Sequence, residues 1–345
     1  MQGLVPNLNH AAPAPQARLA VRYADLPTAR ALLADPATIL GVVGFAAERP
    51  DFLPSPCPFI AAPLSPAAGD AMFEIWSGSA PCRPLSCGAV TGACNDKFAF
   101  GAVTLDEAGS ASLEEAVEAA YVSLFDFLDA AGFAAPLRFW NYLTAITQDD
   151  RGLERYRRFN VGRHAAFAAR LREPLPPAAS AVGGDRGASV IYVLAAHEPA
   201  RPLENPRQVS AFAYPPVYGP RSPSFSRASV HALGTAETMF ISGTASITGH
   251  ETRHIGDLNS QIAETIENLR ALNHAAARPL PLGEQWACKI YLRESSYREP
   301  VARAVEAAFG PLCQCLYLRS DICRAELLVE IEAFQHFTLK EAAAF

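Results

Sequence analysis

Features of several large protein classes are absent from this sequence of 345 residues. No run approaches the roughly 18 consecutive apolar residues that a membrane-spanning helix needs. The 29 Lys and Arg residues, mostly Arg, form no basic stripe and the formal net charge is −6, which argues against nucleic acid and membrane as partners. Residues 1–15 lack the basic stretch and apolar core of a secretory signal. We therefore expect a cytoplasmic protein, and an Arg-rich site for a small anion remains open.

The eight cysteines show no metal-binding pattern. Cys82, Cys87 and Cys94 are unevenly spaced and have no His nearby, and the single residue between Cys313 and Cys315 is too few for the usual zinc spacing. A cytoplasmic compartment keeps thiols reduced. The cysteines are therefore interpreted as free thiols, and no metal site is expected.

The composition is that of a globular protein, with 50% hydrophobic and 19% charged residues, and the chain is long enough for two domains. One order of predicted elements, helix, strand, helix, strand, occurs twice along it. The first helix begins at Ser112, where Glu115 completes a capping box, and its counterpart begins near Asp257. The elements that follow are strands at 137–146 and 286–293, helices at 156–171 and 297–309, and strands at 188–195 and 326–333.

This repeat predicts an α+β fold of two units, each a mixed β-sheet with helices packed on one face. We place the boundary near residue 200, which gives units at residues 21–200 and 201–345. Residues 1–20 are expected to form a loosely held arm. The Pro-rich residues 174–177, with Gly183 and Gly184 soon after, predict a surface loop inside the first unit.

Three motifs stand out in the second unit. Residues 240–247 read FISGTASI, residues 254–257 read HIGD, and residues 327–333 read LLVEIEA. Over about the last 110 residues this pattern resembles the RidA-like, or YjgF-like, fold. The resemblance implies that 201–345 is a RidA-like unit and 21–200 a degenerate copy. RidA-like proteins are single units that form trimers, so a chain with two units departs from the simple deaminase.

Longer segments extend the resemblance over both units. They read RFWNY at 138–142, GLERYRRFNVGRH at 152–164, YPPVYGPRSPSFSRA at 214–228 and SDICRAELLVEIE at 320–332. Together they are similar to the chorismatases, two-unit relatives that release pyruvate from chorismate. The resemblance covers nearly the whole chain beyond residue 20. It implies chorismate, a small dianion, as the substrate and requires no metal or organic cofactor.

Glu330 is the candidate general acid. Alternation along the predicted strand places Glu330 and Glu332 on one face. A carboxyl group beside apolar neighbours and a second carboxyl group should resist ionisation, as a general acid must near neutral pH. On the residues alone, the commoner interpretation is a pair of glutamates on an open, solvated sheet face. The resemblance implies that Glu330 is the acid and leaves Glu332 as a helper or a surface residue.

Cys323 is the second catalytic candidate, again through the resemblance. In the chorismatase pattern, a Cys in this slot implies the type that makes hydroxybenzoate, whereas Ala implies the type that hydrolyses chorismate to a dihydrodiol. The alternative for Cys323 is a small buried thiol, which is the commonest role of Cys.

Six residues are candidates for substrate binding. A guanidinium group suits a carboxylate, so Arg163 and Arg293 are candidate anchors, although either could be a surface Arg. Tyr214, Tyr218 and Arg221 lie in a Pro- and Gly-rich loop, and such loops often carry function. Thr244 follows the Ser-Gly at a strand end, where a plain strand–turn boundary is the alternative.

The resemblance thus implies a chorismatase that forms pyruvate and 3-hydroxybenzoate, with 4-hydroxybenzoate as a further possible product. The alternatives are a chorismate hydrolase giving a dihydroxycyclohexadiene carboxylate, a RidA-like imine deaminase and a non-catalytic module that binds small anions. The deaminases use an Arg shortly before the closing strand, and the sequence Ile322-Cys323-Arg324 leaves that slot ambiguous. A monomer and a homotrimer are both compatible with two units per chain.

Overall fold

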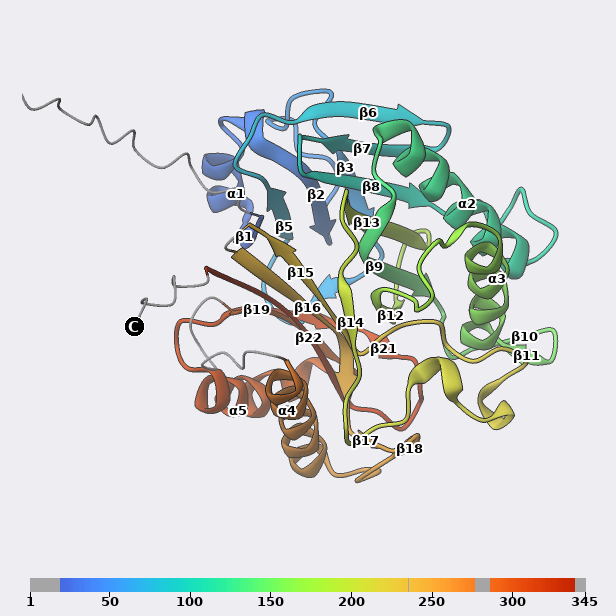
Figure 1. Ribbon diagram of the computed structural model, residues 1–345. Helices are drawn as coiled ribbons and strands as arrows, with labels where there is room; N and C mark the ends of the chain where they lie inside the picture. Colours follow the sequence, from blue (N-terminus) through green and yellow to red (C-terminus); the bar gives the residue numbers. More distant parts are fainter. Residues whose placement is uncertain (1–18, 235, 277–285, 339–345) are drawn as a thin grey trace, which may run out of the picture.

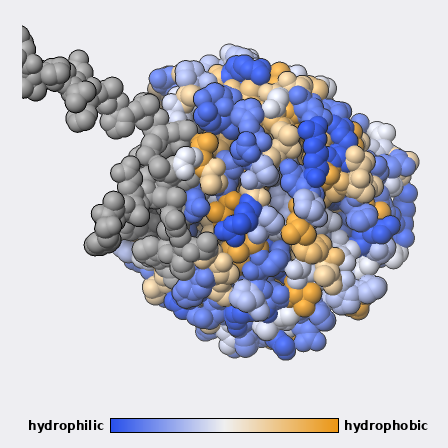
Figure 2. Space-filling model, in the orientation of Figure 1, coloured by the Kyte–Doolittle hydropathy of each residue, from blue (hydrophilic) through white to orange (hydrophobic). Residues whose placement is uncertain are grey.

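The computed structural model describes residues 19–234, 236–276 and 286–338. The arm expected at residues 1–20 lies outside the described residues except at its end, where Leu19 is buried and Ala20 begins the first strand. The described helices include none that is long and apolar enough to cross a membrane. On the face seen in Figure 2, hydrophilic residues alternate with smaller hydrophobic patches.

Two seven-stranded mixed sheets form the body of the molecule (Figure 1). The first sheet has the order β21(Asp321–Ile322), β12(Ala178–Gly184), β9(Ala135–Thr144), β13(Val190–Ala196), β8(Phe98–Thr104), β7(Val90–Cys94), β6(Arg83–Cys87). The second has the order β14(Arg201–Leu203), β15(Ala228–Leu233), β16(Ala236–Ala245), β22(Val329–Thr338), β19(Trp286–Leu292), β20(Gln314–Arg319), β4(Ser65–Pro66). Each sheet has one parallel pair, β9 with β12 and β19 with β20.

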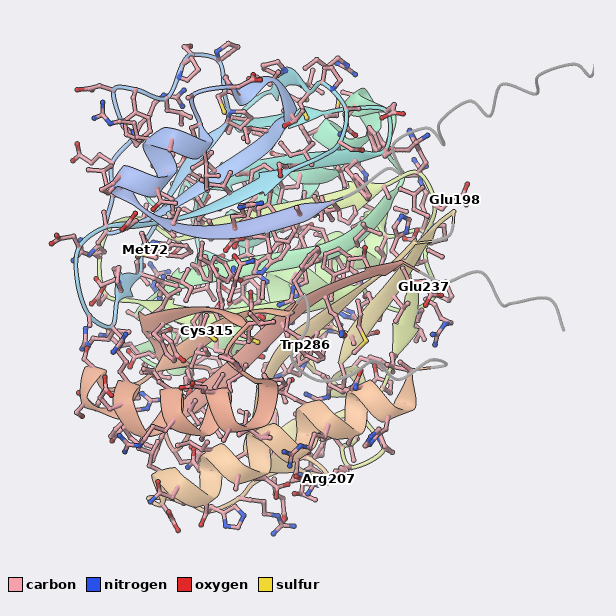
Figure 3. All side chains as sticks on the ribbon, turned by 90° about the vertical axis from the view of Figure 1, so that its left-hand side faces the viewer. Met72, Glu198, Arg207, Glu237, Trp286 and Cys315 are labelled. Atoms are coloured by element: carbon pink, nitrogen blue, oxygen red, sulfur yellow. The ribbon has the colours of Figure 1, made fainter. Side chains whose placement is uncertain are left out.

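Two helices cover the outer face of each sheet. Helices α2(Leu113–Ala131) and α3(Arg155–Arg170) pack on the first sheet, and α4(Leu258–Ala275) and α5(Arg298–Phe309) pack on the second, as Figure 3 shows for the latter pair. The capping box is present, because Ser112 accepts from the Glu115 amide at 3.2 Å and Glu115 accepts from the Ala111 amide at 3.2 Å. The inner faces of the sheets share a third core. The expected α+β architecture is confirmed.

A small third sheet, which the sequence did not predict, closes one side of the space between the large sheets. It has the order β1(Ala20–Asp25), β5(Met72–Ser77), β2(Ile39–Phe45), β3(Phe59–Ala62), and helix α1(Leu26–Leu32) follows β1. The ring of Trp76 on β5 contacts Trp140 of the first sheet and Phe334 of the second, at centroid distances of 5.3 and 5.2 Å. The small sheet therefore contributes directly to the central core.

One prediction about the first unit needs correction. Residues 178–184 form β12 and not a surface loop, because the small residues there allow close packing: a Cβ at Gly184 would lie 2.4 Å from the Pro63 carbonyl oxygen. In addition, each sheet takes one short edge strand from the other half of the chain. Strand β21 pairs with β12 in the first sheet, and β4 pairs with β20 in the second.

Candidate functional site

A cavity of about 210 Å³ lies where β12 of the first sheet faces β16 and β22 of the second. Helix α3 and two loops, residues 214–227 and 323–326, complete its walls. The cavity is lined by residues from both halves of the chain, and its size suits a small molecule. We call it the junction cavity.

Glu330 lies in the wall of the junction cavity. It follows Val329 on β22, and Val329 and Ile331 point to the core under α4 and α5, so alternation turns Glu330 inward between the sheets. Its side chain is only 4% exposed. The carboxyl group passes over Gly243 of β16, where a Cβ would lie 2.0 Å from Glu330 Oε1. A glycine at this position gives the carboxyl group its space.

The surroundings of Glu330 favour its neutral form. Burial, followed by the neighbouring Glu332 carboxylate, raises the pKa of Glu330 to about 8. The guanidinium groups of Arg138 and Arg227 act against this rise without cancelling it. The carboxyl group is therefore mostly protonated at neutral pH, as a general acid must be. The solvated sheet face considered for this glutamate pair is not observed.

Glu332, two residues further on, has the opposite character. Burial alone would raise its pKa, but Lys289 and Arg138 outweigh burial and lower the pKa of Glu332 to about 2. Its carboxylate accepts from Lys289 Nζ at 3.0 Å, from Arg138 at 2.9 Å and from Ser180 Oγ at 2.6 Å. Two carboxyl groups on one face of a strand thus hold different protonation states near neutral pH.

The structure brings Arg163, Tyr214 and Tyr218 into the wall of the junction cavity together with Glu330. The guanidinium group of Arg163 is buried and donates to Asn160 Oδ1 at 2.8 Å, while its Nε has no hydrogen-bond partner among the described residues. The hydroxyl of Tyr218 donates to the His250 carbonyl at 2.6 Å. These side chains can present donors and a positive charge to an anion.

Cys323 also lines the cavity, from the loop that precedes β22. Burial raises the pKa of the Cys323 thiol to about 12, and the neighbouring Glu330 adds to this rise. The side chain is therefore a neutral thiol that fills volume near Glu330 and is a poor nucleophile.

Arg293 is not among the residues that line the junction cavity. It directly follows strand β19, which ends at Leu292, and its guanidinium group turns back onto the loop before β22. It donates to the carbonyls of Leu327 and Arg324, both at 2.8 Å, and to Asp321 at 3.0 Å. Arg293 thus holds in place the loop that carries Cys323.

Arg221 and Thr244 are likewise absent from the cavity wall. Arg221 is exposed on the surface. Thr244 is buried and donates to the Ser242 carbonyl at 2.9 Å, because alternation on β16 turns Gly243 and Ala245 to the cavity and Thr244 away from it. The strand end named in the sequence analysis thus borders the cavity through Gly243 and Ala245 and not through Thr244.

Several residues of the cavity wall are not among the candidates that the sequence analysis named. Arg227 and Arg324 lie in the segments that carried the family resemblance, and these segments were the available signal. Arg157 also lines the cavity, whereas its neighbours Arg155 and Arg158 pair with Glu107 and Glu114. Ser180 was missed because β12 was predicted to be a loop.

The fold and the cavity define a two-sheet protein with a small-molecule site that joins buried arginines to a protonated carboxyl group. The family model for the N-terminal part of FkbO/Hyg5-like chorismatases matches residues 74–195. A 3-hydroxybenzoate synthase of Streptomyces hygroscopicus is 36% identical over 310 residues, covering 85% of this chain and 90% of that protein.

A chorismatase of Streptomyces rapamycinicus is 33% identical, covering 86% of this chain and 92% of that protein. A chorismatase crystal structure superposes with a TM-score of 0.81 and 28% identity, covering 93% of this chain and 99% of that chain. The chain belongs to the chorismatase family.

Proposed function

We propose that this protein converts chorismate to 3-hydroxybenzoate and pyruvate. The observation that carries the proposal is the protonated Glu330 at the wall of an arginine-lined cavity. The similarity to a protein named 3-hydroxybenzoate synthase supports this choice of product.

The charges of the cavity suit a dianion. Arg157, Arg163, Arg227 and Arg324 line it. Two of them, Arg163 and Arg227, are buried, and each has an Nε without a hydrogen-bond partner among the described residues. A guanidinium group binds a carboxylate through charge-assisted hydrogen bonds. We infer that Arg163 and Arg227 hold the substrate carboxylates. Arg227 also donates a hydrogen bond to the Tyr214 hydroxyl at 2.7 Å and so orients that side chain.

Glu330 then supplies the proton. Transfer to the methylene carbon of the enolpyruvyl group gives an oxocarbenium-like centre at the ether carbon. The ring 4-hydroxyl of the substrate adds to that carbon and loses its proton. Cleavage of the bond between this oxygen and ring carbon 4, of the bond between the original ether oxygen and the side-chain carbon, and loss of the proton on ring carbon 3 then leave 3-hydroxybenzoate and pyruvate without net consumption of water. The hydrolytic route to the dihydrodiol consumes one water. In this proposal the Cys323 thiol occupies the space that such a water would need.

The test is the reaction itself. Purified protein is incubated with chorismate, pyruvate is followed by coupling to lactate dehydrogenase, and the ring product is identified by chromatography. We expect equal amounts of pyruvate and hydroxybenzoate. Absence of pyruvate would remove the chorismatase activity, and a dihydrodiol as the main product would move the protein to the hydrolytic alternative.

Glu330→Gln is the matched variant, because the amide keeps the shape of the side chain but has no acidic proton. We expect a fall in kcat of on the order of 10² or more, the usual scale of general acid catalysis, with chorismate binding retained. Chorismate binding is measured by calorimetry. A Glu330→Gln enzyme with nearly unchanged kcat would exclude Glu330 as the acid.

A further inference from the structure

A second set of charges lies behind the junction cavity, in the core between the sheets. Lys289 of β19 is 1% exposed and contacts two carboxylates, Glu332 at 3.0 Å and Glu74 at 2.6 Å. Glu74 lies on β5 of the small sheet, is fully buried and also accepts from the Tyr192 hydroxyl at 3.2 Å. The small sheet thus places a negative charge in the central core.

These charges balance one another. Lys289 and Arg138 are the cations of the set, and Glu74 and Glu332 are its carboxylates. All four side chains are at least 95% buried, so water does not screen them. A buried charge is tolerated only when it is paired. Ionisation of Glu330 would therefore leave this buried set with one excess negative charge.

Ser180 connects this set to the position of Glu330. Its hydroxyl donates to Glu332 at 2.6 Å and accepts from Arg138 at 2.6 Å and from the Gly243 amide at 2.9 Å. Gly243 is the residue over which the Glu330 carboxyl group passes. The Ser180 side chain alone therefore links the Glu332 and Arg138 pair to the Gly243 backbone beneath the Glu330 carboxyl group.

Other charged and titratable groups also face Glu330. Those that act on it or respond to it are Glu332 on its own strand, Arg138 on β9, Arg227 before β15, Cys323 in the loop before β22 and Tyr156 on α3. Further cavity groups are the cations Arg157, Arg163 and Arg324, the carboxyls Glu154 and Glu326, and Tyr214 and Tyr218. Substrate carboxylates would neutralise cations on the cavity side, so the core side determines the charge that Glu330 meets in the complex.

We propose that Glu74 is a positioning residue for the reaction: by pairing with Lys289 it completes a neutral buried set, so that no core cation is left over for Glu330 and the acid keeps its proton. The proposal rests on the proposed role of Glu330 as the acid. It gives the small N-terminal sheet a part in the chemistry, although no residue of that sheet lines the junction cavity.

The first test is Glu74→Gln, which removes one negative charge and keeps the side-chain shape. The core then carries an excess of one positive charge, ionisation of Glu330 becomes easier, and the enzyme loses its acid at lower pH. We expect the alkaline limb of the pH profile of kcat, which reports the enzyme–substrate complex, to move to lower pH by on the order of one pH unit, the size of effect that one poorly screened charge exerts.

Two further variants separate charge balance from a structural role. Glu74→Gln combined with Lys289→Gln removes one charge of each sign, so the limb should return to its parental position. Tyr192→Phe removes a neutral hydroxyl that contacts both Glu74 and Lys289, and the limb should stay in place. The proposal is overturned if folded Glu74→Gln keeps the parental limb, if the double variant is displaced, or if Tyr192→Phe moves the limb as far. If Glu74→Gln does not fold, the position of the limb in the double variant decides: a parental position supports the proposal and a displaced one overturns it.

A direct titration keeps this inference distinct from the proposed function. The carboxyl carbon of Glu330 is observed by NMR in protein with ¹³C-labelled glutamate and is assigned by its loss in Glu330→Gln. Its pKa should be lower in Glu74→Gln than in the parent. If that shift occurs while Glu330→Gln keeps its turnover, Glu74 controls Glu330 but Glu330 is not the acid. If turnover needs Glu330 and no shift occurs, the proposal for Glu74 alone fails.

Discussion

At the scale of the residue, the two arginines first considered as anchors have different tasks. Arg163 lies in the wall of the junction cavity, and Arg293 is engaged with loop carbonyls outside it. Arg163→Ala should weaken chorismate binding by roughly 10- to 100-fold, because a charge-assisted hydrogen bond contributes about 1.5–3 kcal/mol. The affinity is measured by calorimetric titration with chorismate of proteins that also carry Glu330→Gln, so that the substrate is not turned over during the measurement. Parental affinity in this variant would place the anchors elsewhere, with Arg227 and Arg324 the next candidates.

Cys323 is expected to set the product and not the rate of pyruvate release. Cys323→Ala opens space beside Glu330, and a space of about one probe sphere with polar neighbours can hold a water molecule. The ratio of dihydrodiol to 3-hydroxybenzoate should therefore rise while pyruvate release continues. Chromatography at equal pyruvate yield measures that ratio. Cys94→Ala, a buried thiol outside the cavity, is the control, and an equal ratio in both variants would make Cys323 a packing residue only.

Alternation placed Glu330 and Glu332 on one face of a strand, as the structure has them, but the residues alone favoured a solvated face, and only the family resemblance singled out Glu330. The sequence was not sufficient for Glu74 or Lys289, which are separated by more than half of the chain and meet only through the packing of three sheets. Thr244 and Arg293 show a related limit. Each lies beside the site in sequence, but strand alternation and loop hydrogen bonds turn the side chain away from it.

At the scale of the element, the loop before β22 depends on α4 as well as on Arg293. Gln261 of α4 donates to the Glu326 carbonyl at 2.9 Å and accepts from the Leu328 amide at 2.8 Å. Gln261→Leu removes both hydrogen bonds and leaves two part-buried backbone groups without their side-chain partner, at a cost of up to about 1–3 kcal/mol for each group. We expect faster amide hydrogen exchange across residues 323–328 and a higher KM for chorismate.

Mass spectrometry measures this exchange peptide by peptide. Glu267→Ala, an exposed substitution on the same helix, is the matched control and should leave the loop unchanged. Equal protection of residues 323–328 in Gln261→Leu and the parent would mean that Arg293 alone holds the loop.

The long helices and most central strands followed from periodicity, since their apolar stripes and caps are local signals. Strand β12 did not, because its sequence AASAVGG consists mainly of small residues that are usual in loops. Its stability comes from pairing with β9 over seven residues and from close packing at Gly183 and Gly184. These contacts join residues that are distant in sequence, so the local sequence around β12 does not reveal them.

At the scale of the whole molecule, the two buried glutamates give stability opposite dependences on pH. The folded pKa of Glu332, about 2, lies below its ordinary value of 4.5, so its contribution is present above pH 4.5 and is lost as pH falls toward 2. The folded pKa of Glu330, about 8, lies above 4.5, so its contribution is present below pH 4.5 and is lost as pH rises toward 8. The free energy of unfolding should therefore fall between pH 5 and 8.

Urea unfolding of the parent and of Glu330→Gln between pH 5 and 8 measures this dependence. The parent should lose on the order of a few kcal/mol relative to the variant, because only the parent must hold a group that resists ionisation. Parallel curves for the two proteins would show that Glu330 ionises as readily in the folded chain as in the unfolded chain.

The short strands β4 and β21 have a consequence for any division of the molecule into halves. Each belongs by sequence to one half and by pairing to the sheet of the other. The halves are therefore interlocked, and cutting the chain near residue 200 would leave each large sheet without one of its edge strands. Each fragment would also carry only part of the lining of the junction cavity, so we expect neither fragment to form the site without the other.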